Sequence, residues 1–257
     1  DESQRIDYIY TFIDGVTTYD ETKAKTRSDY EYIPGSVTKI DYVMVYNVKG
    51  AIPNDTPEIV YLTSVIYYSD DGEHVDYTIG LKGGVVTTWS EYTYGENANA
   101  DKVAIIHQYG ATGTWNAPNQ GNLKSVTYYV TQDTAGTSID ERERVAYVIN
   151  YDALDKDPSN VWKTVNVYNY LADSTELLNT IYTYGVKGRA SLADVRNRSQ
   201  DNTANFESMT QYITSSVHPV IYDPAYIGKH IYYVVTYKAG IADMYAEYQY
   251  FAIDNGT

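Results

Sequence analysis

The sequence predicts an all-β protein: a repeat-built antiparallel sheet, or a β-solenoid or sandwich, of about thirteen strands with little helix. Three observations predict this class. Tyrosine dominates the composition, tyrosines recur at strand spacing, and glycine-containing turn signals separate short runs of β-forming residues at regular intervals.

The composition already excludes two classes of chain. The 257 residues include 31 tyrosines but only three phenylalanines and eight leucines. Helical bundles depend on Leu, Ala and Met, and disordered chains are poor in aromatic and β-branched residues. A tyrosine ring packs across strands while its hydroxyl stays compatible with water. The excess of tyrosine over phenylalanine therefore favours thin sheets whose aromatic faces are partly exposed to water.

Tyrosine also recurs at the period of a strand. In an extended strand, residues i and i+2 lie on one face, whereas on a helix they are well apart. Six Tyr-x-Tyr pairs have this spacing: Tyr8/Tyr10, Tyr30/Tyr32, Tyr92/Tyr94, Tyr168/Tyr170, Tyr182/Tyr184 and Tyr248/Tyr250.

In the first half of the chain, each expected strand is a run of Tyr, Val, Ile and Thr that ends near a turn signal. The expected strands are 5–13, 28–33, 39–48, 59–69, 74–80, 85–94 and 102–109. The signals between them include Asp14-Gly15, Pro34-Gly35, Asp71-Gly72 and Gly83-Gly84.

The same reasoning gives the second half. The expected strands are 123–132, 143–151, 161–171, 178–185, 206–214 and 229–238, with a further segment at 244–253. Only 191–198 departs from the pattern, as a short helix capped by Ser191 or a long loop. We expect one repeat-built domain over 1–257; if there are two, the division falls at 190–205.

Segments of the chain resemble one another. Leu62–Tyr68 (LTSVIYY) and Leu123–Tyr129 (LKSVTYY) nearly coincide, and Trp162–Tyr168 and Leu178–Tyr184 are looser copies. Their aligned hydroxyl residues are Ser64, Ser125, Thr164 and Thr180, at separations that are roughly multiples of 20 residues. Such a period is typical of repeat architectures.

One copy carries a resemblance to a known family. Tyr182, Tyr184, Gly188 and Arg189 match the pattern Tyr-x-Tyr-Asp-x-x-Gly-Arg-Leu, so the segment is similar to the YD repeat of RHS-type bacterial surface and toxin proteins. Gly185 replaces the Asp and Ala190 the Leu. The family's large members coil their repeats into a shell around a cargo. For a chain of this length the resemblance implies an open, twisted sheet or solenoid whose ends need covering.

Charge and cysteine content restrict the partners. The formal net charge of −15 comes with no cluster of Lys or Arg, which disfavours nucleic acid and anionic membranes as partners. No stretch is apolar enough to span a membrane. The absence of cysteine excludes disulfides and thiolate sites. The first residue is Asp1 rather than Met, so we expect a processed or truncated chain, and we expect the protein to be extracellular or at a cell surface.

Candidate sites are few. The four histidines are scattered and no catalytic motif occurs, so we expect no enzyme and no cofactor. Oxygen-rich loops leave calcium open, with an acidic turn as the alternative. The candidate calcium ligands are Asp152, Asp155, Asp157 and Asn160, and a second candidate is the segment 70–73 with Asp76.

Two functions remain. The first is a secreted structural protein, a subunit of an extracellular fibre or surface layer that self-associates into a homopolymer through the terminal strands. Its expected assembly contacts are Tyr8, Tyr10, Tyr248 and Tyr250. The alternative is a carbohydrate-binding or adhesive module. Trp115, in the loop 113–118, is then the candidate glycan contact because aromatic rings stack on sugars.

Overall fold

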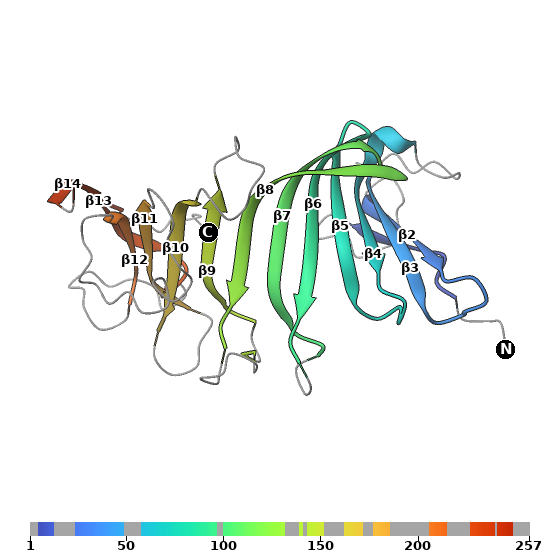
Figure 1. The fold of residues 1–257 in the computed structure, drawn as a ribbon, viewed down its shortest axis with the longest axis horizontal. Coiled ribbons are helices and arrows are strands. Elements are labelled where there is room, and N and C mark those ends of the chain that lie inside the picture. Colours follow the sequence, from blue (N-terminus) through green and yellow to red (C-terminus); the bar gives the residue numbers. More distant parts are fainter. Residues whose placement is uncertain are drawn as a thin grey trace, which may run out of the picture. The chain divides into compact units, whose positions relative to one another are not determined.

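A computed structural model describes residues 5–12, 24–48, 58–96, 100–131, 139–140, 143–151, 162–171, 177–185, 206–214, 227–239 and 241–248. Within these ranges the chain is all-β. Its strands form one open, antiparallel, 14-stranded sheet in which the order of the strands is their order in the sequence (Figure 1).

Each strand lies next to the strand that follows it in the sequence. Their bounds are β1 (Tyr8–Phe12), β2 (Ala24–Tyr32), β3 (Ile40–Asn47), β4 (Leu62–Tyr68), β5 (Val75–Lys82), β6 (Val85–Tyr94), β7 (Val103–Thr114), β8 (Ala117–Tyr129), β9 (Val145–Tyr151), β10 (Trp162–Tyr170), β11 (Leu178–Gly185), β12 (Phe206–Tyr212), β13 (Ile231–Lys238) and β14 (Ile241–Glu247). A single turn of 3-10 helix, η2 (Ile59–Tyr61), precedes β4.

The predicted class is confirmed in its open-sheet form, and every expected strand is present. Several boundaries were wrong, and the last strand begins at Ile241 rather than 244. β2 begins at Ala24 rather than 28, because pairing with β1 recruits a polar segment that has no strand pattern of its own. Residues 59–61 are helical instead of extended. The predicted loop 113–118 is the tip of a long hairpin, with Trp115 and Asn116 as its turn.

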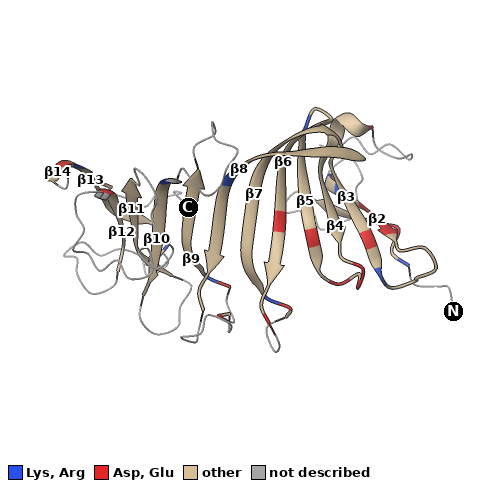
Figure 2. Cartoon of the chain, viewed as in Figure 1, with Lys and Arg blue, Asp and Glu red and all other residues tan. Residues whose placement is uncertain are grey.

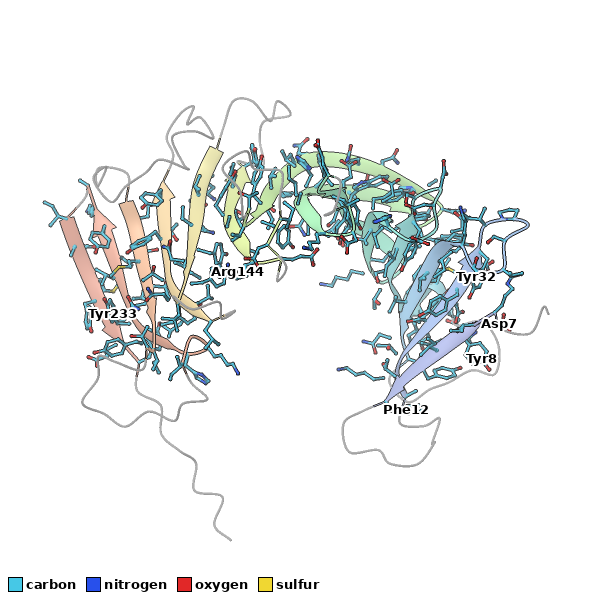
Figure 3. The ribbon with its side chains drawn as sticks, turned by 90° about the horizontal axis from the view of Figure 1, so that it is seen from below. Asp7, Tyr8, Phe12, Tyr32, Arg144 and Tyr233 are labelled. Carbon is cyan, nitrogen blue, oxygen red and sulfur yellow. The ribbon has the colours of Figure 1, made fainter. Side chains whose placement is uncertain are left out.

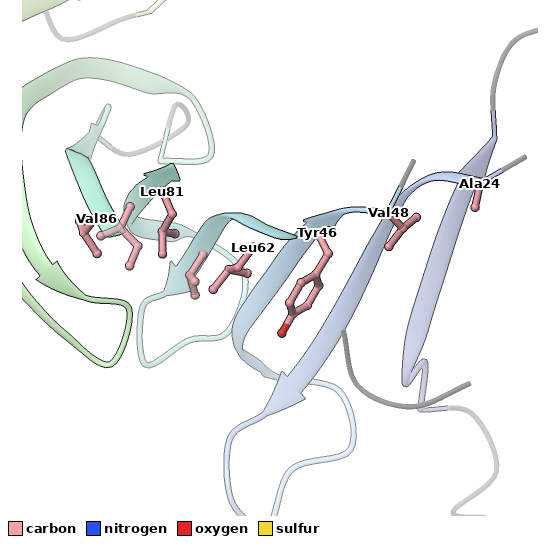
Figure 4. Packing of buried hydrophobic residues seen from close by; sticks show 8 residues of the cluster. Ala24, Tyr46, Val48, Leu62, Leu81 and Val86 are labelled. Carbon is pink, nitrogen blue, oxygen red and sulfur yellow. The ribbon is translucent and has the colours of Figure 1, made fainter. Parts of the chain in front are cut away.

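The chain divides into two compact units, Asp1–Lys124 and Ser125–Thr257. The predicted division at 190–205 and the helix at 191–198 lie outside the described residues, as do Gly188 and Arg189 of the YD-like segment. In the first unit, buried side chains follow one another along one face of β2 to β6 (Figure 4). In the second unit, a smaller cluster joins Tyr147 and Ile149 to Val165.

The repeated motif has a structural meaning. The residue after each aligned hydroxyl is a core residue in three of the four copies: Val65, Val126 and Val165 are all at most 2% exposed. The residue two positions later lies on the same face, where Tyr67 and Tyr128 stack on tyrosines of the next strand. In these two copies, the motif therefore encodes one buried residue and one cross-strand aromatic.

A one-residue β-bulge recurs in all twelve strand pairs whose register is described. Each time the extra residue lies near the start of the later strand. The bulge explains why Leu62 and Val65, three positions apart, are both in the core: Thr63 between them is the extra residue. Bulges also increase the local twist. The extra residues are Lys25, Asp41, Thr63, Asp76, Thr87, Ala104, Ala146, Lys163, Asn179, Glu207, Tyr232 and Asp243.

We predict that the turn between β4 and β5 tolerates no side chain at Gly72. Gly72 and Gly35 both have a positive φ, of 72° and 85°, but a Cβ at Gly72 would lie 2.5 Å from the Cβ of Lys39, whereas nothing lies within 4 Å at Gly35. Gly35→Ala should cost about 1 kcal/mol of unfolding free energy from backbone strain. Gly72→Ala should cost about 1–3 kcal/mol more from the steric overlap. Denaturant titration of both variants measures the difference, and equal losses would contradict the prediction.

Candidate functional site

The two edges of the sheet are the terminal strands. In the described part of the chain, β1 pairs only with β2 and β14 only with β13. Each therefore presents one row of backbone N–H and C=O groups without a neighbouring strand. Such a row is a template for another strand.

Strand β1 carries two of the predicted assembly residues. Tyr8 and Tyr10 lie on one face, in edge-to-face contact with ring centroids 5.3 Å apart. Tyr8 is 51% exposed, and Ile9, on the opposite face, is 41% exposed. Figure 3 shows Tyr8 and Phe12 along this strand. The edge thus exposes apolar surface on both faces.

The position of these tyrosines depends on Arg27 of β2. Its guanidinium lies 4.6 Å from the ring centroid of Tyr8 and 5.8 Å from that of Tyr10. Arg27 is 9% exposed, and its Nε lies 2.5 Å from an Asp29 carboxylate oxygen, so the buried charge is paired. Arg27 lies outside the strand expected at 28–33, so its contact with these rings was not predicted. The alternation of Arg27 and Asp29, two residues apart, is the signal that would have placed them on one face.

Strand β14 is the more exposed edge. Every one of its residues is exposed, with Ile241 at 74% and Met244 at 61%. Tyr245 lies on the face that carries the buried Val235, and its ring is 5.3 Å from that of Tyr233. Tyr248, the third predicted assembly residue, follows the strand and is exposed. The fourth, Tyr250, lies outside the described residues.

The first unit contains an aromatic ladder, which we define as Tyr42, Tyr67, Tyr77 and Trp89 on strands β3 to β6. Successive ring centroids are 5.8, 4.4 and 4.4 Å apart, and the last two contacts are parallel stacks. The rings therefore cover one another's faces. A sugar ring stacks on an open aromatic face, which Tyr77, stacked between Tyr67 and Trp89, does not offer.

Trp115 lies at the tip of the β7–β8 hairpin, which bends over the neighbouring strands of its unit (Figure 1). Its backbone carbonyl accepts a 2.8 Å hydrogen bond from the Tyr67 hydroxyl, and its ring centroid is 6.2 Å from that of Tyr42. The tip is therefore fastened to the aromatic ladder. The glycan contact at Trp115 stays a prediction, and its ring is half-buried rather than presented on a free loop.

A carboxylate joins this ladder to the hairpin. A Glu91 carboxylate oxygen accepts hydrogen bonds from Trp89 Nε1 at 3.2 Å and from Gln120 Nε2 at 2.6 Å. Burial, followed by the charge of Glu91 and a hydrogen bond with it, raises the pKa of the Tyr109 hydroxyl. Through its contacts with Tyr109 of β7 and Gln120 of β8, the Glu91 carboxylate links β6 to both strands.

The acidic turn at 70–73 is held by internal hydrogen bonds. The Asp71 carboxylate accepts from the Ser69 hydroxyl, from the backbone N–H groups of Glu73 and His74, and contacts the His74 ring at 2.6 Å. The Ser69 bond is the largest of the causes that lower the pKa of Asp71 well below its ordinary value. In this turn the carboxylate therefore stabilises the backbone.

No group of three or more His, Asp or Glu side chains in the described ranges is arranged to hold a metal ion. The candidate calcium ligands Asp152, Asp155, Asp157 and Asn160 lie outside those ranges. Figure 2 shows the charged residues distributed over strands and turns of both units. No helix in the described part of the chain is long and apolar enough to cross a membrane.

The described residues define an all-β protein built as a single open meander, in which β1 and β14 are the two edge strands. No known family model matches the chain, and no curated protein matches it.

We predict that the Tyr67 hydroxyl, rather than ring stacking alone, holds the hairpin tip. Tyr67→Phe removes the hydrogen bond to the Trp115 carbonyl and should lower the unfolding free energy by about 1 kcal/mol. It should also shift the fluorine NMR signal of fluorotryptophan at position 115. Tyr77→Phe is the matched control, since the neighbouring ring stacks without such a bond. Identical behaviour of the two variants would show that the bond contributes nothing.

We predict alkaline unfolding driven by buried phenols. Burial, followed by the charge of Asp29, raises the pKa of Tyr46 to about 12, and burial also raises the pKa of Tyr42, Tyr67, Tyr77 and Tyr168. A raised pKa means that stability is complete below about pH 10, the ordinary value, and is lost as the pH rises through the folded-state value. As the pH rises, the tyrosinate absorbance of the folded protein should therefore increase later than that of the denatured chain, and it should then increase cooperatively. Superimposable titrations of the folded and denatured protein would contradict this.

Proposed function

We propose that this protein is a secreted structural protein, a subunit of an extracellular fibre or surface layer that assembles by addition of strands at its sheet edges. The observation that carries the proposal is the position of β1 and β14. They are the two edges of one open sheet, and both expose apolar side chains.

Natural monomers protect their edge strands with charges, proline or covering elements. Strand β1 has none of these within Tyr8–Phe12, a segment of aromatic, isoleucine and threonine residues. Strand β14 has Asp243 and Glu247 but also exposes Ile241, Met244 and Tyr245. Edges of this composition support ordered strand addition, in which backbone hydrogen bonds supply affinity and side chains supply specificity.

The sheet itself supports extension. Each strand in the described ranges contacts mainly the strands before and after it in sequence, so the fold is built from nearest-neighbour pairings. A copy added at an edge would form the same kind of pairing, with tyrosines facing tyrosines across the junction. Growth then requires no rearrangement of the subunit.

We predict that a single lysine on either edge strand prevents assembly. Ile9→Lys and Met244→Lys each place a charge on an edge strand, beside the side chains of the strand that would be added there. Each variant should raise the critical concentration for assembly at least tenfold, which corresponds to about 1.4 kcal/mol per contact. Val37→Lys is the matched control because Val37 is 55% exposed but lies in the turn between β2 and β3. Sedimentation velocity and negative-stain microscopy report assembly.

Circular dichroism should show all three variants to be folded. Deletion of residues 1–13 should likewise leave a folded monomer that does not polymerise. Fibres or sheets formed by the edge variants at the wild-type concentration would contradict the proposal, as would a wild-type chain that remains monomeric at high concentration.

A further inference from the structure

We infer that the subunits join head to tail, with β14 of one copy pairing antiparallel with β1 of the next. The inference rests on the proposed function and adds the partner surface and its polarity. It excludes the two symmetric junctions, β1 with β1 and β14 with β14, which would produce closed or alternating assemblies.

The strand order gives the first argument. Every strand between the edges has its predecessor on one side and its successor on the other, and all pairs are antiparallel. Successive strands therefore alternate in direction, so β1, an odd-numbered strand, and β14, an even-numbered strand, run in opposite directions. A β14–β1 junction therefore continues the same meander from one copy to the next, with no change in strand direction.

Charge gives the second argument. Strand β14 carries Asp243 and Glu247 and no basic residue. A β14–β14 junction would place these carboxylates of two copies against one another, which is unfavourable across a strand pair. Strand β1 has no charged residue between Tyr8 and Phe12, so it meets β14 without such repulsion.

The ends of the two edges are also complementary. In an antiparallel junction, Glu247 at the end of β14 approaches the start of β1, where Arg5 precedes the strand and lies over the Tyr32 ring. Asp243 approaches the other end of β1, beside the exposed Lys25 at the beginning of β2. Among the described residues 5–12, Asp7 near the same start is the carboxylate that opposes this arrangement.

The faces of the two strands give the third argument. Tyr8 and Tyr10 of β1 lie on the face that carries the core of the first unit, because Tyr10 packs against that core. Tyr245 lies on the face of the buried Val235 in the second unit. When the core faces of two copies are continuous, Tyr245 meets Tyr8 and Tyr10, while Met244 meets Ile9 and Thr11 on the opposite face.

The absence of native cysteine makes this geometry directly measurable. Four single variants, Ile9→Cys, Thr11→Cys, Tyr8→Cys and Met244→Cys, are assembled alone and in pairs and treated with a short bismaleimide cross-linker. Met244→Cys mixed with Ile9→Cys or Thr11→Cys should give a cross-linked dimer. Met244→Cys mixed with Tyr8→Cys should give at least tenfold less, because these two side chains lie on opposite faces. The Val37→Cys variant measures the background yield of cross-links that form by random collision.

The outcomes separate the inference from the function on which it rests. Efficient cross-linking of Met244→Cys with itself, or of Ile9→Cys with itself, would overturn the head-to-tail polarity while leaving edge assembly in place. Polymers that form without any of these cross-links would show that the terminal strands are not apposed. A chain that neither cross-links above the Val37→Cys level nor assembles would overturn both proposals.

Discussion

The structure depends on one constraint: a strand in this sheet is paired only with the strands before and after it in sequence, so cross-strand side chains supply most of its packing. Tyrosine meets this requirement on a half-wet surface. Its ring stacks on the next strand, as Tyr67 does on Tyr77, and its hydroxyl finds a backbone acceptor. The hydroxyls of Tyr67, Tyr94 and Tyr170 donate to the carbonyls of Trp115, Val75 and Val145. Phenylalanine would provide the ring without this second contact.

Arginine complements tyrosine in both units. Arg27 pairs with Asp29 and lies under the rings of β1, and Arg144 pairs with Asp140 at 2.6 Å and lies 5.0 Å from the Tyr170 ring. In each case a carboxylate compensates the guanidinium while an aromatic ring covers it. The first unit uses this arrangement to hold its edge strand. One row of backbone groups on this edge strand has no neighbouring strand in the described chain.

Much of the fold could be predicted because its signals are local. Tyr-x-Tyr spacing, runs of β-forming residues and turn residues located all fourteen strands, whereas their sequential order in one sheet came from the tertiary structure. Tyr8 and Tyr10 could be assigned to an edge on the same grounds. Arg27 was missed because its spacing from Asp29 is the one strand-like signal in residues 24–27, which become a strand by pairing with β1 and β3. The hairpin tip was also missed, since its contacts join Trp115 to Tyr42 and Tyr67 across long separations in sequence.

The sequence by itself determined the strand period, the turns and the repeated strand motif, because these depend on neighbours within a few positions. The tertiary structure decided the bulge at the start of each later strand, the division at Lys124 and Ser125, and which side chains remain exposed at β1 and β14. These features depend on the hydrogen-bond register between strands. Register is a property of two segments together, and it is set only when both have found each other.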